Sequence, residues 1–352
     1  MPARVAFGIG LGSSVGLLGG ADTSKLMDLV RMADDYGATA IGTYDSAFLG
    51  GDAYVRATLI ALAAPRAAVG LRPSNPLTRE PQVMASFLAS IDRLTGGRAF
   101  LDVASGDSAV FNIGYPAASR ARIEDYVACV RGLLAHGEAT YQGRPQRVRW
   151  AGEVVRPRVP ISICAEGPRM LHLGGRIGDG VIAGTGLLPE VIRDTIARVH
   201  AGAREAGRDP AEVDLWFTAR SSLHEDRQTA VDNVRASVSS ILNHAMRFGL
   251  DGKQVPDDLR AKIQAYVDGY DLYDHVLHAG RNPRRMAELG LTDYAIDRWA
   301  LAGTPRDWIA RIEQLAERGA TRLWVGVNGA DLDAQLRCLR LMGEEVLPRF
   351  VR

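Results

Sequence analysis

Two aspartates, Asp45 and Asp107, are the acidic residues expected where a ligand would bind. Asp107 lies in the segment Ser105-Gly106-Asp107-Ser108, directly after an apolar run, and Asp45 follows the apolar run 38–44. A partly buried carboxylate at such a position acts as a general acid or base, or orients a cofactor ring by hydrogen bonding. The alternative is that each aspartate is an ordinary turn or cap residue, which is the commoner role after a strand.

Glycine and small hydroxyl residues recur after the other apolar runs. They suit a site where the backbone approaches a flat or phosphorylated ligand, although ordinary turns have the same composition. The segments are 10–14, 72–75, 166–169, 184–186 and 220–222.

The segment Ala165-Glu166-Gly167-Pro168 runs from a strand into a helix. Free backbone N–H groups at a helix start lie at the positive end of the helix dipole and can bind a phosphate. A plain N-terminal cap explains the segment equally well, because every helix has one. A second feature, Arg72-Pro73, is a position where a cis peptide is possible, although trans is the usual form.

Eight apolar runs alternate with helical segments of about ten to twenty residues, which predicts a (β/α)8 barrel. Residues after each strand of such a barrel converge on one face, so the segments above are expected to lie together. A doubly wound open sheet is the alternative, but no GxGxxG follows the first run. The runs are 5–10, 38–44, 67–71, the start of 97–108, 159–165, 180–183, 213–219 and 321–327.

The segment 224–301, between the seventh and eighth runs, is too long for one barrel helix. Its pattern predicts helices over 226–248, 257–273 and 283–289 within one domain spanning 1–352. Because loops that follow barrel strands emerge at the ligand end, this insertion is expected beside the site as a lid or a dimerisation element. A hairpin is expected within 137–155, and Phe48, Phe111 and Tyr115 are candidates for an apolar wall of the substrate pocket.

Composition excludes several classes of function. The 42 basic and 41 acidic side chains nearly cancel, so there is no electrostatic footprint for nucleic acid or an anionic membrane. Three widely spaced cysteines argue for a reducing compartment and against disulfides or zinc. Neither a signal peptide nor an apolar stretch of roughly 20 residues occurs. We expect a cytoplasmic protein that acts on a small molecule, with no metal site.

The chain resembles the bacterial luciferase-like superfamily, and within it the methylenetetrahydromethanopterin reductase-like branch. No single motif is decisive, and the resemblance rests on order and spacing. The matching segments are Leu94-Thr95-Gly96-Gly97-Arg98, Ala104-Ser105-Gly106-Asp107-Ser108, Val159-Pro160-Ile161, Gly167-Pro168, Gly178-Asp179-Gly180-Val181 and Ala302-Gly303-Thr304-Pro305.

This resemblance implies a (β/α)8 barrel that binds FMN or the deazaflavin coenzyme F420 at the carboxyl ends of its strands. It implies that the backbone of 166–168 meets the phosphate. Asp107 and Asp45, singled out above by their positions after strands, are the candidate catalytic residues. The full set of expected cofactor-binding residues is Asp45, Ser74, Asn75, Ser105, Gly106, Asp107, Ala165, Glu166, Gly167, Pro168 and Thr185.

One departure from the family pattern affects the choice of cofactor. Many F420-dependent relatives have a histidine after the aspartate that ends the second strand, where this chain has Ser46. We therefore expect an FMN-dependent monooxygenase that receives reduced FMN from a separate flavin reductase and forms a homodimer or higher homo-oligomer. The alternatives are an F420-dependent reductase or dehydrogenase that transfers a hydride, and a non-catalytic flavin-binding or assembly subunit.

Overall fold

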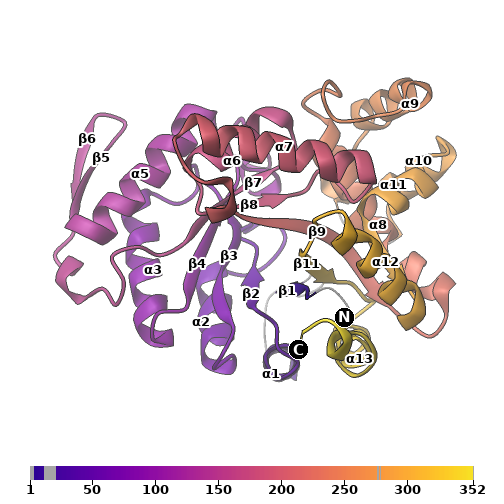
Figure 1. Cartoon of the computed structure of the whole chain (residues 1–352), viewed down its shortest axis with the longest axis horizontal. Helices are drawn as coiled ribbons and strands as arrows, with labels where there is room; N and C mark the ends of the chain where they lie inside the picture. Colours follow the sequence, from indigo (N-terminus) through magenta and orange to yellow (C-terminus); the bar gives the residue numbers. More distant parts are fainter. Residues whose placement is uncertain (1–3, 12–20, 276, 278, 352) are drawn as a thin grey trace.

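Eight parallel strands close into a barrel in the computed structural model, which describes residues 4–11, 21–275, 277 and 279–351 (Figure 1). The last strand pairs with both the first and the seventh, and the seventh pairs with the sixth, which closes the ring. This confirms the predicted (β/α)8 barrel. The strands are β1 Ala6–Gly10, β2 Ala40–Thr43, β3 Ala68–Ser74, β4 Ala99–Val103, β7 Ile161–Ala165, β8 Gly180–Ala183, β9 Asp214–Leu223 and β11 Arg322–Val327.

Helices surround this barrel and cover the outer faces of its strands (Figure 1). Several begin at the expected signals. The Asp52 carboxylate caps one helix. Another has Pro305 as its first residue, and Thr304 and Asp307 on either side of it form a capping box. The helices are α1 Ala21–Asp35, α2 Ala53–Ala63, α3 Pro81–Thr95, α4 Ser108–Phe111, α5 Arg120–His136, α6 Pro168–Ile177, α7 Pro189–Glu205, α12 Pro305–Glu317 and α13 Leu332–Leu341.

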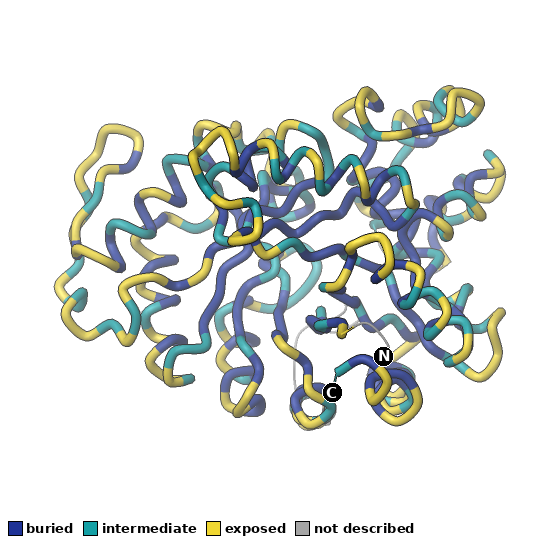
Figure 2. The backbone as a smooth tube through the Cα atoms, in the orientation of Figure 1, coloured by how far each residue is buried: buried dark blue, intermediate teal, exposed yellow. Residues whose placement is uncertain are grey.

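The barrel interior is filled mainly by aromatic side chains. Phe100, Trp216 and Trp324 are buried there and meet edge to face, with ring centroids 5.6 and 5.7 Å apart. Space for the Trp324 indole comes from glycine on β1, because a Cβ added at Gly8 would lie 2.1 Å from that ring. The main core lies on the other face of the strands, between the barrel and the helices (Figure 2).

A Gly8→Ala variant is expected to lose about 1–3 kcal/mol of unfolding free energy, because one methyl group overpacks the interior against Trp324. Urea denaturation followed by tryptophan fluorescence would measure the change. Gly152→Ala is the matched control, since a Cβ there has no neighbour within 4 Å and needs no left-handed backbone. Equal stability of the two variants would contradict the tight fit at Gly8.

The insertion between β9 and β11 folds into four helices and a short strand. The helices are α8 Arg227–Met246, α9 Asp257–Asp268, α10 Arg281–Glu288 and α11 Thr292–Trp299, and β10 Ala300–Gly303 pairs with the end of β9. They share a separate apolar cluster around Val238, Tyr266 and Trp299. Lid and dimerisation roles remain predictions.

One sequence-based prediction for this insertion is corrected, and two elements were missed. The helix predicted over 257–273 ends at Asp268, because Gly269 follows it and residues 272–274 form a separate 3-10 turn. Helix α11 and strand β10 were not predicted. Leu291, in front of α11, has no side chain that could cap the helix, so the sequence carries no start signal there.

The hairpin expected within 137–155 is present. It consists of β5 Glu138–Tyr141 and β6 Arg144–Arg147, which pair antiparallel, and it projects from the side of the molecule opposite α9 and α10 (Figure 1). Among the helices in the described residues, none is both long and apolar enough to cross a membrane.

Candidate active site

A cavity of about 260 Å³ lies at the carboxyl ends of the barrel strands. Its walls come from the ends of all eight barrel strands and from one face of α8, so the insertion lies beside the site as expected. Six of the predicted cofactor-binding residues line it: Asp45, Ser74, Asn75, Gly106, Asp107 and Glu166. Residues 12–14 of the predicted segment 10–14 lie outside the described residues, and Gly10 lines the cavity.

Five predicted residues lie outside this cavity. Ala165 is fully buried in the core behind the barrel, because side chains alternate along β7 and its neighbours Cys164 and Glu166 are the ones that face inward. Ser105 contributes no lining either, and its carbonyl accepts a hydrogen bond from the Ala118 N–H at 2.7 Å. The other three, Gly167, Pro168 and Thr185, line a small adjoining hollow at the start of α6.

Asp45 is buried and already fully engaged by the protein. It accepts a hydrogen bond from the Ser74 hydroxyl at 2.7 Å and contacts the Arg79 guanidinium at 3.3 Å. Arg79 in turn bonds Asp52 at the start of α2. This network orients the loop after β2.

Asp107 lies in a cluster that the sequence did not reveal. One carboxylate oxygen is 2.7 Å from Nδ1 of His244, and the other is paired with Arg247. The opposite ring nitrogen of His244, Nε2, is 3.4 Å from a carboxylate oxygen of Glu166. Two strand-end acids therefore flank one histidine that is supplied by α8 of the insertion.

These contacts set the charge of each group in the cluster. Burial alone would lower the pKa of His244, but the Asp107 and Glu166 carboxylates outweigh it and raise that pKa to about 9. Burial opposes ionisation of Asp107 as well, yet His244 and Arg247 hold its pKa well below the ordinary range. At neutral pH the cluster therefore contains an imidazolium between two carboxylates.

Arg72 lines the cavity and forms a second buried ion pair, with Asp102. The Arg72 guanidinium bonds Asp102 at 2.9 Å and lies 3.8 Å from the centre of the Trp324 ring. Burial raises the pKa of Asp102 to about 6 in spite of the neighbouring Arg72. The peptide bond between Arg72 and Pro73 is cis, the less usual of the two forms considered from the sequence.

The aromatic wall expected from Phe48, Phe111 and Tyr115 does not line the cavity. The Phe111 ring instead lies 4.6 Å from the Arg247 guanidinium, and Tyr115 is exposed. The Phe48 ring meets Tyr273 of the insertion edge to face, with ring centroids 6.1 Å apart.

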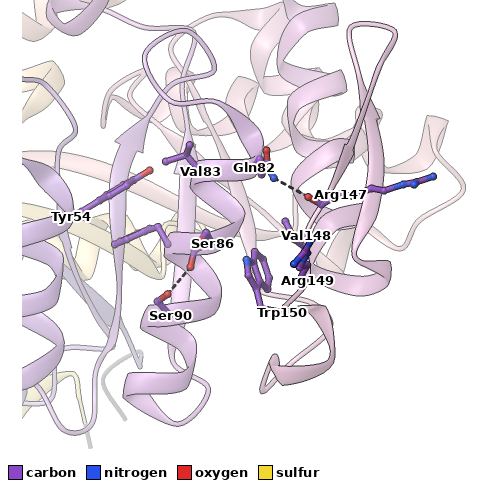
Figure 3. Close-up of a pocket in the computed structure, with 10 residues that line it drawn as sticks. Tyr54, Gln82, Val83, Ser86, Ser90, Arg147, Val148, Arg149 and Trp150 are labelled. Atoms are coloured by element: carbon purple, nitrogen blue, oxygen red, sulfur yellow. Dashed lines mark hydrogen bonds between the residues drawn. The ribbon is translucent and has the colours of Figure 1, made fainter.

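A larger and more open hollow, of about 690 Å³, lies on the outside of the barrel. Figure 3 shows Gln82, Ser86 and Ser90 on α3 facing the segment 147–150. The Gln82 amide donates to the Arg147 carbonyl at 2.8 Å, and the Ser90 hydroxyl donates to the Ser86 carbonyl at 2.8 Å. It has neither a histidine nor a carboxylate in its lining, so the cavity at the strand ends is the better candidate for chemistry.

Comparison with known proteins identifies the family. Residues 5–322 match the family model described as luciferase-like monooxygenase. The chain belongs to the luciferase-like monooxygenase family. This confirms the resemblance stated from the sequence, and this luciferase-like protein is a flavin- or deazaflavin-dependent oxidoreductase.

Two relatives are similar over most of this luciferase-like chain. The 5,10-methylenetetrahydromethanopterin reductase of Methanolobus tindarius is 27% identical over 92% of this chain and 95% of its own. The F420-dependent glucose-6-phosphate dehydrogenase of Nakamurella multipartita is 27% identical over 81% and 78%.

Solved structures agree with the fold. The coenzyme F420 dependent tetrahydromethanopterin reductase from Methanopyrus kandleri superposes with a TM-score of 0.75 at 23% identity, covering 99% of this chain and 100% of that one. A long-chain alkane monooxygenase superposes with a TM-score of 0.72 at 14% identity, covering 100% and 93%. At these identities the likeness concerns the barrel alone.

Proposed function

We propose that this protein is an F420-dependent reductase that transfers a hydride to the carbon of a C=N or C=O bond. The observation that carries the proposal is His244, a protonated imidazole facing the cavity between Asp107 and Glu166. The relatives named as a reductase and as an F420-dependent dehydrogenase support the deazaflavin alternative over the FMN-dependent monooxygenase that the sequence alone favoured.

The cavity suits a flat ring with polar edges. Ala104 and Ile182 offer apolar surface, whereas the paired hydroxyls of Ser46 and Ser108, 3.0 Å apart, offer hydrogen bonds. The N–H of the buried Trp324 indole has no partner in the described part of the chain, so it can donate to a molecule bound in the cavity. The backbone of 166–168 at the start of α6 remains the proposed phosphate contact.

His244 would supply the proton that the reduction requires. When bound, reduced F420 supplies the hydride. Nδ1 of His244 donates to Asp107 at 2.7 Å, which leaves the proton on Nε2, farther from its partner at 3.4 Å, as the one to give up. The substrate carbon gains the hydride, its nitrogen or oxygen gains that proton, and Asp107 holds the neutral imidazole in place.

A serine at position 46 is compatible with this proposal. Ser46 is buried and hydrogen-bonded to Ser108 beside Asp107. His244 reaches the same part of the cavity from α8, so an acid–base group is still present.

Titration of the purified apoprotein with F420 and with FMN, followed by fluorescence, tests the choice of cofactor. We expect saturable binding of F420 at micromolar concentrations or below, with FMN binding at least tenfold more weakly. Reoxidation of reduced F420 would then be followed with a panel of cyclic imines and ketones. Tight FMN binding without F420 binding would refute the proposal and restore the monooxygenase, together with its flavin reductase partner.

The homodimer or higher homo-oligomer expected from the sequence remains a prediction.

A further inference from the structure

Arg220 on β9 lines the cavity and has no partner among the residues that the structure describes. Its side chain lines the cavity wall, and no hydrogen bond or ion pair joins it to any residue in the described ranges. The Nε atom is buried with its donor unused. A guanidinium carries five donors and keeps its charge at any ordinary pH, so leaving it unmatched in a cavity is costly unless a ligand completes it.

The other arginines around the site are all engaged. Arg72 is bound by Asp102, and Arg79 by Asp45 and Asp52. Arg247 is bound by Asp107, and Arg298 donates to backbone carbonyls, among them that of Thr185 at 2.9 Å. Arg220 therefore differs from its neighbours in lacking an acceptor.

The indole of Trp324 presents a second unused donor to the same cavity. It is 5% exposed, and its Nε1 has no hydrogen-bond partner within the described ranges. In the register of β9 and β11, Trp324 pairs with Thr218 and Gly326 pairs with Arg220. Arg220 and Trp324 thus belong to neighbouring strands and lie one inward-facing layer apart, with no side chain at Gly326 between them.

Arg220 carries the positive charge of the site that no carboxylate neutralises by direct contact among the described residues. Asp107 and Glu166 bear negative charge, and His244 and Arg247 neutralise them by direct contact. The two carboxylates attract the Arg220 guanidinium only at longer range. Burial and the like charge of Arg72 together lower the pKa of Arg220. An added anion would remove this imbalance.

We propose that Arg220 and the Trp324 indole N–H bind an anionic oxygen group of the substrate, a carboxylate or a phosphate. This deepens the proposed function and rests on it, because it names the substrate class of the same site. A guanidinium fork matches two oxygens of such a group, and the indole supplies a third donor. The imine or carbonyl would then lie within the same cavity as His244.

The test uses the apoprotein and two probes, sodium benzoate and inorganic phosphate, titrated by calorimetry at low ionic strength. We expect at least one probe to bind the wild-type protein. Arg220→Met should weaken that binding roughly 10- to 100-fold, the range for a lost charge-assisted hydrogen bond. Trp324→Phe, which keeps an aromatic ring, should weaken it about two- to tenfold. The better of the two probes distinguishes a carboxylate from a phosphate.

Controls separate this proposal from the choice of cofactor. Arg220→Lys should retain part of the affinity, and Arg144→Met, on the exposed hairpin strand β6, should retain all of it. Fluorescence titration of F420 should give the same affinity for Arg220→Met as for the wild type.

Three results would overturn the proposal. They are no binding of either probe to the wild type, unchanged binding in Arg220→Met, or a loss of F420 affinity in that variant as large as the loss of anion affinity. The last would assign Arg220 to the cofactor. Failure of the wild type to bind F420 would refute the proposed function instead, and the anion titration does not depend on it.

Discussion

Replacing His244 with glutamine is expected to slow turnover by about 10²- to 10⁴-fold, the contribution of a positioned general acid. Glutamine keeps a donor for Asp107 but has no acidic proton to give to the substrate. The affinity for F420 should change little, because the cofactor's proposed contacts lie on the strand ends. Rates would be measured with reduced F420 and whichever imine or ketone of the panel the wild type reduces fastest.

The rate of turnover is expected to depend on pH through the protonation of His244. The pKa of His244 is raised to about 9, so the protonated acid is present below that value and is lost above it. Turnover of the wild type should therefore fall as pH rises through about 9, and this fall should be absent from the residual rate of His244→Gln. His136→Gln, an exposed histidine at the end of α5, is the matched control. Wild-type turnover and an unchanged profile in His244→Gln would exclude its role as the acid.

The barrel and the place of its site could be predicted from the sequence because both follow from local patterns. Each buried strand is a short apolar run that ends in small or polar residues, and parallel strands in a barrel bring those ends to one face. Asp107 and Glu166 follow this rule and line the cavity. Ala165 does not, because one position along a strand reverses the direction of its side chain.

His244 and Arg220 escaped prediction for different reasons. His244 lies on a predicted helix, but its role depends on how the insertion folds back over the barrel, which no local pattern encodes. A signal exists in hindsight: Ser237, Ser240, Ile241 and His244 have the spacing of one helix face, and all four line the cavity. A solvent-exposed stripe has the same composition. Arg220 stood in a segment predicted at the ligand end, and only its missing partner distinguishes it.

The two acidic clusters of the site differ in what they contribute to stability. For Asp102, burial outweighs the neighbouring Arg72, so its pKa is raised and the charged form is disfavoured. For Asp107, two cations outweigh burial and its pKa is lowered. Only the second arrangement is expected to stabilise the folded protein through its charge.

An Asp107→Asn variant is therefore expected to lose about 3 kcal/mol of unfolding free energy near pH 6, the lower end of the range for breaking a buried ion pair. The lower end applies because the Asp107 side chain is 20% exposed. Asparagine would leave Arg247 without its carboxylate and His244 with Glu166 alone. The pKa of His244, followed by NMR, should fall from about 9 towards its ordinary value of about 6.5.

The loss of unfolding free energy in Asp107→Asn depends on pH because the pKa of His244 is raised and that of Asp107 is lowered in the folded protein. The raised pKa of His244 adds stability that is complete below about pH 6.5 and is lost as pH rises through about 9. The lowered pKa of Asp107 adds stability that is complete above its ordinary value of about 4 and is lost at lower pH. The difference between wild type and Asp107→Asn should be largest between about pH 4 and 6.5 and should shrink towards pH 9 and above.

Urea denaturation of both proteins across this pH range would measure the difference. Glu153→Gln is the matched control, because Glu153 pairs with Arg93 at 2.8 Å on the surface, where the two side chains are 69% and 63% exposed. It should change the unfolding free energy by less than about 1 kcal/mol. A pH-independent loss in Asp107→Asn, or one no larger than in Glu153→Gln, would show that the imidazolium at His244 is not maintained by Asp107.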